Sequence, residues 1–316
     1  LVLRQLEETG YTVVDSLLDV EKDLQPVIDE YQQLLNGLSK SLDVKNFTSY
    51  ESDNLSFGEQ LTRLMQVTDG TIYQNLEISL PQNNISTETP MHHGPAVFQL
   101  LTNPKLLDIV EELIGPEIYS NPVQHVRIKP PQKLLPLNQK QNTLVSQAIW
   151  HQDQGTVRKE ADETMMLTVW IPIVDATEEN GCLVIAPGSH KRGLSLHCEM
   201  PSGIHEIPDR LVGCSRKTLP MNAGDVLFMN KATMHSSLPN TSDGIRWSFD
   251  LRYNPTGDAT GRPWFPGFVA RSRSNPNSEL RSARLWAESW RKARDSLAEM
   301  ESPVFQRWNP NDPLCA

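Results

Sequence analysis

Apolar residues recur at helical spacing in the first third of the chain. One such run extends from Val20 to Leu38. A second, Pro104 to Ile114, begins with a proline suited to a first helical turn and is followed by Gly115. We therefore predict that residues 1–115 are mainly helical, and that a last helix runs from about Ser278 to Met300.

From about Ile118 the pattern changes to short β-type runs separated by turn signals. These runs are Val123–Ile128, Ser146–Trp150, Met165–Val174, Cys182–Ile185, Asp225–Met229 and Ile245–Tyr253. They predict a β-sandwich or barrel core over residues 116–255, followed by a C-terminal lid and helix over 256–316. Because no internal repeat or long low-complexity linker interrupts the sequence, we expect residues 1–316 to form a single domain.

The run Ile245–Tyr253 alternates strictly between two kinds of residue. Its odd positions are apolar or aromatic, so the even positions share the opposite face of a strand, and these are Arg246, Ser248, Asp250 and Arg252. Such a face is either exposed to solvent or lines a polar cavity. In a cavity an arginine is costly unless it meets a carboxylate. That carboxylate could be Asp250 or a ligand, and periodicity alone leaves both open.

Composition restricts the possible partners. The 316 residues are 38% hydrophobic and 22% charged, with a net charge of -10, which indicates a soluble globular chain without general affinity for nucleic acid or anionic membranes. No apolar run approaches the roughly 20 residues needed to span a bilayer. The chain begins with Leu1 rather than Met, which leaves open whether a leader was removed.

The four cysteines are spread singly along the chain. Cys182, Cys198, Cys214 and Cys315 form neither the C-x-x-C pairs of a zinc site nor a dense disulfide framework. We therefore expect a reducing compartment and a cytoplasmic location. The sequence gives no indication of the oligomeric state.

The stretch Trp150-His151-Gln152-Asp153 carries candidate metal ligands. On a strand, His151 and Asp153 would project from the same face. His235, which lies 82 residues after Asp153 and eleven before Arg246, offers a third ligand. Two imidazoles and one carboxylate suit the Fe(II) of non-haem oxygenases, because they leave open positions for a co-substrate and oxygen. The same ligands also suit zinc or manganese, and a histidine satisfied by a neighbouring acid is the structural alternative.

These residues occur together with a longer motif. Residues 179–190 read Glu-Asn-Gly-Cys-Leu-Val-Ile-Ala-Pro-Gly-Ser-His. With the His151-Gln152-Asp153 triplet, His235 and Arg246, this segment resembles the phytanoyl-CoA dioxygenase family of Fe(II)/2-oxoglutarate oxygenases, from about residue 115 to 253. The resemblance implies a mainly β fold with flanking helices around a double-stranded β-helix, a jelly-roll or cupin-like core.

The resemblance also implies the roles of individual residues. The Fe(II) ligands would be His151, Asp153 and His235, and Arg246 would pair with the far carboxylate of 2-oxoglutarate. Three further residues would line the co-substrate pocket, namely His125, Trp170 and Ser237. For Trp170, an ordinary place in the core is the alternative.

The activity implied is hydroxylation of an unactivated C–H bond of a small molecule, with O2 and 2-oxoglutarate as co-substrates and succinate and CO2 as products. The chain shows no lysine cluster suited to a CoA phosphate, which favours a substrate without CoA. The alternatives are a cupin-like metal-dependent hydrolase or isomerase, and a non-catalytic 2-oxoglutarate-binding sensor. Two irregular segments, Lys129–Gln141 and Gly193–Val212, could border the site, and Arg262–Phe268 could form a lid or a substrate wall.

Overall fold

The computed structural model describes residues 1–41, 55–200, 204–213, 215–309 and 311–315. Among these residues, backbone ladders join seven strands into one antiparallel sheet in the order β1-β9-β4-β11-β2-β12, with β3 also pairing with β11. The strands are β1 (Tyr11–Val14), β2 (Glu117–Ser120), β3 (His125–Lys129), β4 (Leu167–Pro172), β9 (Val226–Asn230), β11 (Arg246–Pro255) and β12 (Phe268–Ser272).

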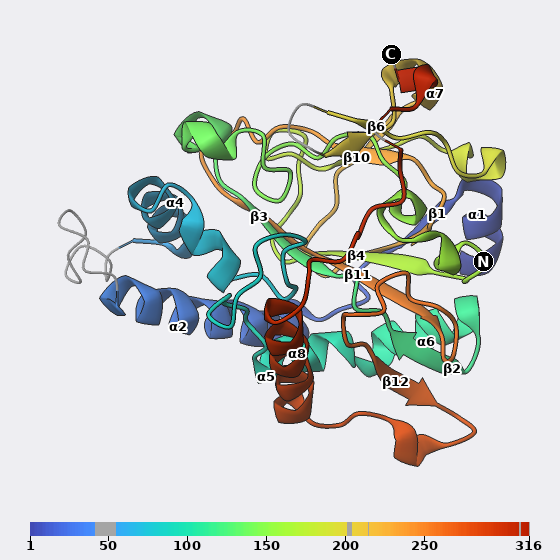
Figure 1. The fold of residues 1–316 in the computed structure, drawn as a ribbon, viewed down its shortest axis with the longest axis horizontal. Helices are drawn as coiled ribbons and strands as arrows, with labels where there is room; N and C mark the ends of the chain where they lie inside the picture. Colours follow the sequence, from blue (N-terminus) through green and yellow to red (C-terminus); the bar gives the residue numbers. More distant parts are fainter. Residues whose placement is uncertain (42–54, 201–203, 214, 310, 316) are drawn as a thin grey trace.

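Two small antiparallel sheets lie above the large sheet in the view of Figure 1. The first has the order β10-β5-β8 and the second pairs β6 with β7. Their strands are β5 (Leu183–Ile185), β6 (Cys198–Glu199), β7 (His205–Glu206), β8 (Lys217–Leu219) and β10 (His235–Ser237).

Helices cover the opposite face of the large sheet, with α2, α5 and α8 below it in Figure 1. The α-helices are α1 (Val2–Thr9), α2 (Gln25–Ser41), α4 (Phe57–Val67), α5 (Pro95–Leu101), α6 (Pro104–Ile114), α7 (Asp209–Val212) and α8 (Ala283–Ala298). A π-helical turn, η1 (Val20–Leu24), leads into α2. The short 3-10 helices are η2 (Thr71–Asn75), η3 (Gln132–Leu134), η4 (Leu137–Gln139), η5 (Asp153–Thr156), η6 (Lys159–Ala161), η7 (Ser189–Arg192), η8 (Pro276–Ser278) and η9 (Pro313–Cys315).

The predicted helices are present, and α6 has the predicted bounds. The side chain of Asn103 accepts hydrogen bonds from the amides of Lys105 and Leu106, and the helix ends at Gly115, whose φ is 94°. These are the caps that a helix end needs, since its terminal backbone groups lack partners within the helix. The last helix, α8, begins later than predicted because Ser282 caps its first turn.

One prediction of local structure was wrong, and one strand was not predicted. Residues 11–14, within the part predicted to be helical, form β1, which pairs with β9 at the edge of the large sheet. Residues 146–150 do not form a strand. There the amide of Ser146 bonds to the carbonyl of Asn142, and that of Ala148 bonds to the Ser237 side chain. The Ala148 carbonyl accepts from the Ser237 amide, so backbone bonding to β10 is present but too irregular for a strand. The other predicted runs contain strands.

The alternation in β11 holds in the structure. Trp247 and Phe249 are buried in the main hydrophobic cluster, where the ring of Tyr31 lies 5.1 and 6.1 Å from theirs. Phe57 of α4 stacks on Trp247 at 4.7 Å. Burial of such large aromatic surfaces fixes the helical layer on one face of β11, so the polar residues of β11 face the other way.

The observed architecture combines antiparallel sheets with helices in a mixed α and β arrangement, and over the described residues the strand ladders do not close into a barrel. The expectation of flanking helices around antiparallel strands is therefore met, while the helical share exceeds a mainly β fold. None of the described helices has the length and apolar character to cross a membrane.

Candidate metal centre and its two cavities

His151 and His235 are brought together by a backbone bridge. Each donates its amide to the carbonyl of the other at 3.0 Å, and their ring centroids lie 4.2 Å apart. His235 is the first residue of β10, which is held in register by β5. Because β5 belongs to the motif segment 179–190, this segment helps to hold His235 in place. Gly181 of that segment has φ +96°, and a Cβ there would meet the Leu238 carbonyl at 2.6 Å.

Asp153 completes the group, although not on a strand as predicted. Gln152 has extended backbone, with φ −117° and ψ 140°, and Asp153 begins the 3-10 helix η5. The extended residue suffices to aim both neighbours the same way. The Asp153 Oδ1 atom lies 3.8 Å from Nε2 of His151 and 3.9 Å from Nε2 of His235. One ligand atom from each of the three residues lies within 4.8 Å of the others.

Backbone carbonyls orient both imidazoles. The Nδ1 of His151 donates to the Ile149 carbonyl at 2.8 Å, and that of His235 donates to the Thr233 carbonyl at 3.0 Å. With the proton on Nδ1, the lone pair of each Nε2 points toward Asp153. Burial lowers the pKa of His151 to about 3, with a further lowering from His235. Neutral imidazole is the form that binds a metal ion.

Asp153 is held as a carboxylate by buried partners. Its side chain receives hydrogen bonds from Arg252 and from the Thr168 hydroxyl. Burial alone would raise the pKa of Asp153, but Arg252 and the two histidines hold it well below its usual range. Two imidazoles and one buried carboxylate are a donor set that fits Fe(II), and Asp153 and both rings have outer hydrogen-bond partners as metal ligands usually do.

A narrow inner cavity adjoins these three residues. Its lining includes Trp170, Ser237 and Arg246, together with Asp250 and Arg252. Arg246 is completely buried and donates from Nη1 to Ser248, while its Nε has no partner. Its guanidinium lies 5.6 Å from the centre of the Trp170 ring. Burial lowers the pKa of Arg246 to about 10, although Asp250 acts in the opposite direction.

The structure removes one alternative for Arg246. Asp250 forms its ion pair with Arg127 of β3, not with Arg246. Within the described part of the chain, Arg246 has no ion pair with an acid. A buried guanidinium without an anion is costly, so the charge of this lining favours an anion. The cavity has a volume of about 20 Å³, so a larger ligand requires its side chains to move.

Sequence reasoning missed Lys129, a second buried basic side chain, which contacts Ser237 of the cavity lining. Lys129 lies opposite Arg246 in the β3–β11 ladder, is completely buried, and donates from Nζ to Ser237. Burial and the charge of Arg246 lower its pKa well below the usual value. A signal was present, because His125, Arg127 and Lys129 alternate with Val126 and Ile128. The predicted strand stopped one residue too early.

A larger outer cavity of about 550 Å³ opens on the other side of His151. His125 lies here rather than in the inner cavity, and its Nδ1 is 3.2 Å from a carboxylate oxygen of Glu77. Four residues line both cavities: Arg127, Ala148, His151 and Arg252. The remaining walls come mainly from segments far apart in the sequence. His125 as a co-substrate contact therefore stays a prediction.

The two segments predicted to border a site contribute unequally. From Gly193–Val212, the described residues His197, Ile204 and His205 line the outer cavity. The lining includes no residue of 129–141 among those described. Arg262 also lines this cavity, while Phe265 and Phe268 from the same stretch are buried in the main cluster. Residues 262–268 thus contribute one side chain to the cavity wall and two to the hydrophobic core.

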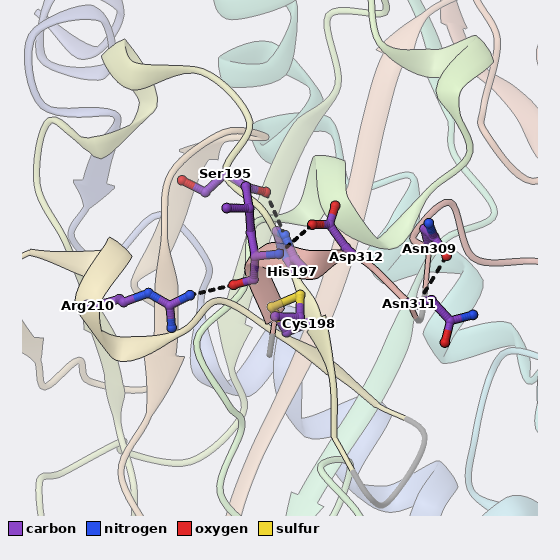
Figure 2. Close-up of a disulfide and its surroundings, with 9 residues drawn as sticks. Ser195, His197, Cys198, Arg210, Asn309, Asn311 and Asp312 are labelled. Atoms are coloured by element: carbon purple, nitrogen blue, oxygen red, sulfur yellow. Dashed lines mark hydrogen bonds between the residues drawn. A yellow bond between two sulfur atoms is a disulfide. The ribbon is translucent and has the colours of Figure 1, made fainter.

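The spacing of the cysteines did not predict a disulfide, yet two of them are joined. Cys198 and Cys315, 117 residues apart, form a disulfide that fixes the end of the described chain beside β6 (Figure 2). Cys182 is buried and free, and Cys214 lies outside the described residues. A single disulfide between distant segments cannot be recognised from the number or the spacing of cysteines in the sequence.

Comparison with known proteins gives consistent matches. The family model for phytanoyl-CoA dioxygenase (PhyH) matches residues 6–248. The 1-deoxypentalenic acid 11-beta-hydroxylase of Streptomyces arenae is 29% identical over 199 residues, which cover 56% of this chain and 65% of that protein. Across this and three further curated relatives, the match spans 51–65% of their length.

Solved structures show the same fold. The non-heme monooxygenase ThoJ has a TM-score of 0.58 at 17% identity, covering 94% of this chain and 98% of that one. HygX from Streptomyces hygroscopicus, with nickel and 2-oxoglutarate bound, has a TM-score of 0.50 at 13% identity and covers 81% and 86%.

Proposed function

The chain belongs to the phytanoyl-CoA dioxygenase family of Fe(II)/2-oxoglutarate oxygenases, and we propose that it hydroxylates an unactivated C–H bond of a small molecule. In this reaction 2-oxoglutarate is decarboxylated to succinate and CO2, and O2 is the second co-substrate. We assign the iron to His151, Asp153 and His235. We assign the far carboxylate of 2-oxoglutarate to Arg246.

The observation that carries the proposal is the buried Arg246 beside the metal ligands, with the basic side chain of Lys129 next to it. Arg246 and Lys129 lie opposite each other across a strand ladder, and neither has an acid partner among the described residues. A dicarboxylate that reaches from the metal toward Arg246 would supply the missing anion. A charge-assisted hydrogen bond between its carboxylate and a buried arginine is stronger than the same bond at the surface. Ser237, bonded to Lys129, and Trp170, packed near Arg246, complete this proposed pocket.

The protein's own part in the reaction is to position groups and to exclude water. The Ile149 and Thr233 carbonyls hold the two imidazoles, and Arg252 and Thr168 hold the carboxylate, so that three donors converge on one point. The chemistry that Fe(II) supplies when held there is the activation of O2.

We assign the substrate to the outer cavity. Its volume of about 550 Å³ falls in the usual range for small-molecule sites. Arg262, in its wall, is only 4% exposed, donates to the Thr156 carbonyl at 2.6 Å, and has an Nε without a partner. No acid pairs with it among the described residues. These features favour a substrate that carries an anionic group.

Two further observations bear on the substrate. The described lining of the outer cavity contains no lysine, which favours a free small molecule over a CoA thioester. The name of the Streptomyces arenae hydroxylase gives an acid as its substrate, which agrees with an anionic group without identifying the molecule.

The experiment that tests the proposal is an oxygen-dependent assay of succinate formation with Fe(II), ascorbate and 2-oxoglutarate. A metabolite panel is screened in parallel for products that gain one oxygen atom. We expect succinate and product to form together. Binding of 2-oxoglutarate without turnover of any panel member would instead favour a sensor, and turnover without 2-oxoglutarate would favour a hydrolase or isomerase.

Some expectations remain proposals. We propose that residues 1–316 act as one oxygenase unit, with residues 1–115 and 256–316 packed against a core formed by 116–255. A cytoplasmic location also stays a prediction, and the Cys198–Cys315 disulfide does not favour it.

A further inference from the structure

The last described residues of the chain form part of the outer cavity. We call residues 301–309 and 311–315 the C-terminal segment. Gln306 and Trp308 of this segment line the cavity. The indole Nε1 of Trp308 donates to the Gly155 carbonyl at 2.7 Å, and its ring stacks on His197 with centroids 4.7 Å apart. The segment is therefore a wall of the cavity rather than a free end.

This wall reaches the metal ligands through His197. The Nε2 of His197 accepts a hydrogen bond of 3.0 Å from the amide of Gln152, the residue between His151 and Asp153. Packing here is close, because a Cβ on Gly155 would meet the His197 ring at 2.4 Å. A displacement of Trp308 would therefore shift the His197 ring, and through it the turn that carries Asp153.

The segment is attached unequally along its length. Before Trp308, Arg307 pairs with Asp162 at 2.5 and 2.7 Å, and Phe305 is buried beneath Arg262. After Trp308, the described residues form one hydrogen bond to the rest of the molecule, from Arg210 to the Leu314 carbonyl at 2.5 Å.

The other attachment after Trp308 is the Cys198–Cys315 disulfide (Figure 2). Cys198 follows His197 directly in the chain, so the bridge joins the segment to the residue on which Trp308 stacks.

We propose that the Cys198–Cys315 disulfide is a redox-sensitive fastener that holds Trp308 and Gln306 as the wall of the substrate cavity. The inference rests on the proposed function, because it takes the outer cavity to be the substrate site. A dithiol reductant would transfer two electrons and two protons, break the S–S bond to give two cysteine thiols, and itself become a disulfide.

The fastener acts on substrate selection. With the bridge intact, Trp308 limits the cavity and keeps water out of it. With the bridge reduced, the described residues after Trp308 keep only the Arg210 contact to the rest of the molecule, so this part of the segment opens more often and the wall loosens. The inner cavity has no residue from the C-terminal segment, so reduction should affect the outer cavity more than the binding of 2-oxoglutarate.

The test is hydrogen–deuterium exchange of the full-length protein, treated first with oxidised glutathione and then with or without dithiothreitol. After reduction we expect exchange to rise at least about tenfold in residues 311–315. A smaller rise of severalfold is expected in 305–309 and in 153–157, with no change in β4 and β11. Cys315→Ser is the matched control, since it should resemble the reduced protein and show no response to dithiothreitol.

Three results would overturn the proposal. Oxidised glutathione could fail to join Cys198 and Cys315 in peptide mapping, reduction could leave exchange in 305–309 unchanged, or the change could be confined to 311–315 without reaching 153–157. Binding of 2-oxoglutarate to the Ni(II)-loaded protein is measured separately. If 2-oxoglutarate did not bind, the proposed function would be contradicted. The exchange results test the role of the disulfide independently of that.

Discussion

The two cavities beside the metal ligands are built in different ways. The inner cavity is lined mainly by side chains from β4, β9, β10 and β11, whose positions are fixed by ladders and by the aromatic packing behind β11. The outer cavity is lined mainly by loops and by the C-terminal segment. Rigid strands suit a co-substrate that the whole family shares, and loops suit a substrate that differs between members.

The largest effect is expected at the metal ligands themselves, in the wall of the inner cavity. Asp153→Ala removes the carboxylate from the metal ligands and leaves Arg252 buried without its anion. We expect iron binding and succinate formation to fall by more than the roughly 100-fold that loss of an outer partner costs. Iron content after desalting and succinate yield measure this. Asp258→Ala, an exposed control, should behave like the wild type, and equal iron content in both variants would contradict the ligand assignment.

Arg246→Ala separates the inner cavity from the outer one. Loss of a buried charge partner costs about 2–5 kcal/mol, so the 2-oxoglutarate concentration needed for half-maximal succinate formation should rise by roughly 30-fold or more. Iron binding should remain, because Arg246 does not contact the ligands. An unchanged requirement for 2-oxoglutarate would show that Arg246 has another role.

Arg262→Gln is the matching change in the outer cavity. We expect about tenfold weaker apparent affinity for an anionic substrate found in the metabolite screen, since a charge-assisted hydrogen bond is lost. The 2-oxoglutarate requirement should not change. Kinetics with the acid and with its methyl ester check this, because the variant should discriminate less between them. Equal losses for acid and ester would argue against an ion pair.

The last prediction concerns the dependence of stability on pH. Burial lowers the pKa of His151 to about 3 and that of His197 to about 4, below the usual 6.5. Between these values the unfolded chain binds more protons than the folded one, so the free energy of unfolding falls as pH drops from 6.5 toward 4. We expect a loss of roughly 1 kcal/mol per pH unit for each group. Urea unfolding of the metal-free protein at pH 7 and 5 measures it, and a flat profile would contradict neutral imidazoles.

The sequence predicted the inner cavity better than the outer one, for a physical reason. Side chains on one strand obey a two-residue period, so Arg246 could be placed on a polar face before the structure was known. Lys129 obeyed the same period and was missed because the strand was ended too early. The family motif gave the three ligands, although Asp153 proved to start a 3-10 helix.

The outer cavity depended on contacts that no local pattern encodes. Trp308 meets Gly155 and His197 across more than 100 residues of chain. The Cys198–Cys315 bridge has the same character. β1 was missed because four residues at a sheet edge give too short a pattern to outweigh helical neighbours.

The most direct measurement is a crystal structure of the Ni(II)-loaded protein soaked with 2-oxoglutarate. We predict density for 2-oxoglutarate in the inner cavity, with one carboxylate within hydrogen-bond distance of Arg246 and the outer cavity left for substrate. Density for 2-oxoglutarate in the outer cavity beside Arg262, with Arg246 unpaired, would contradict it.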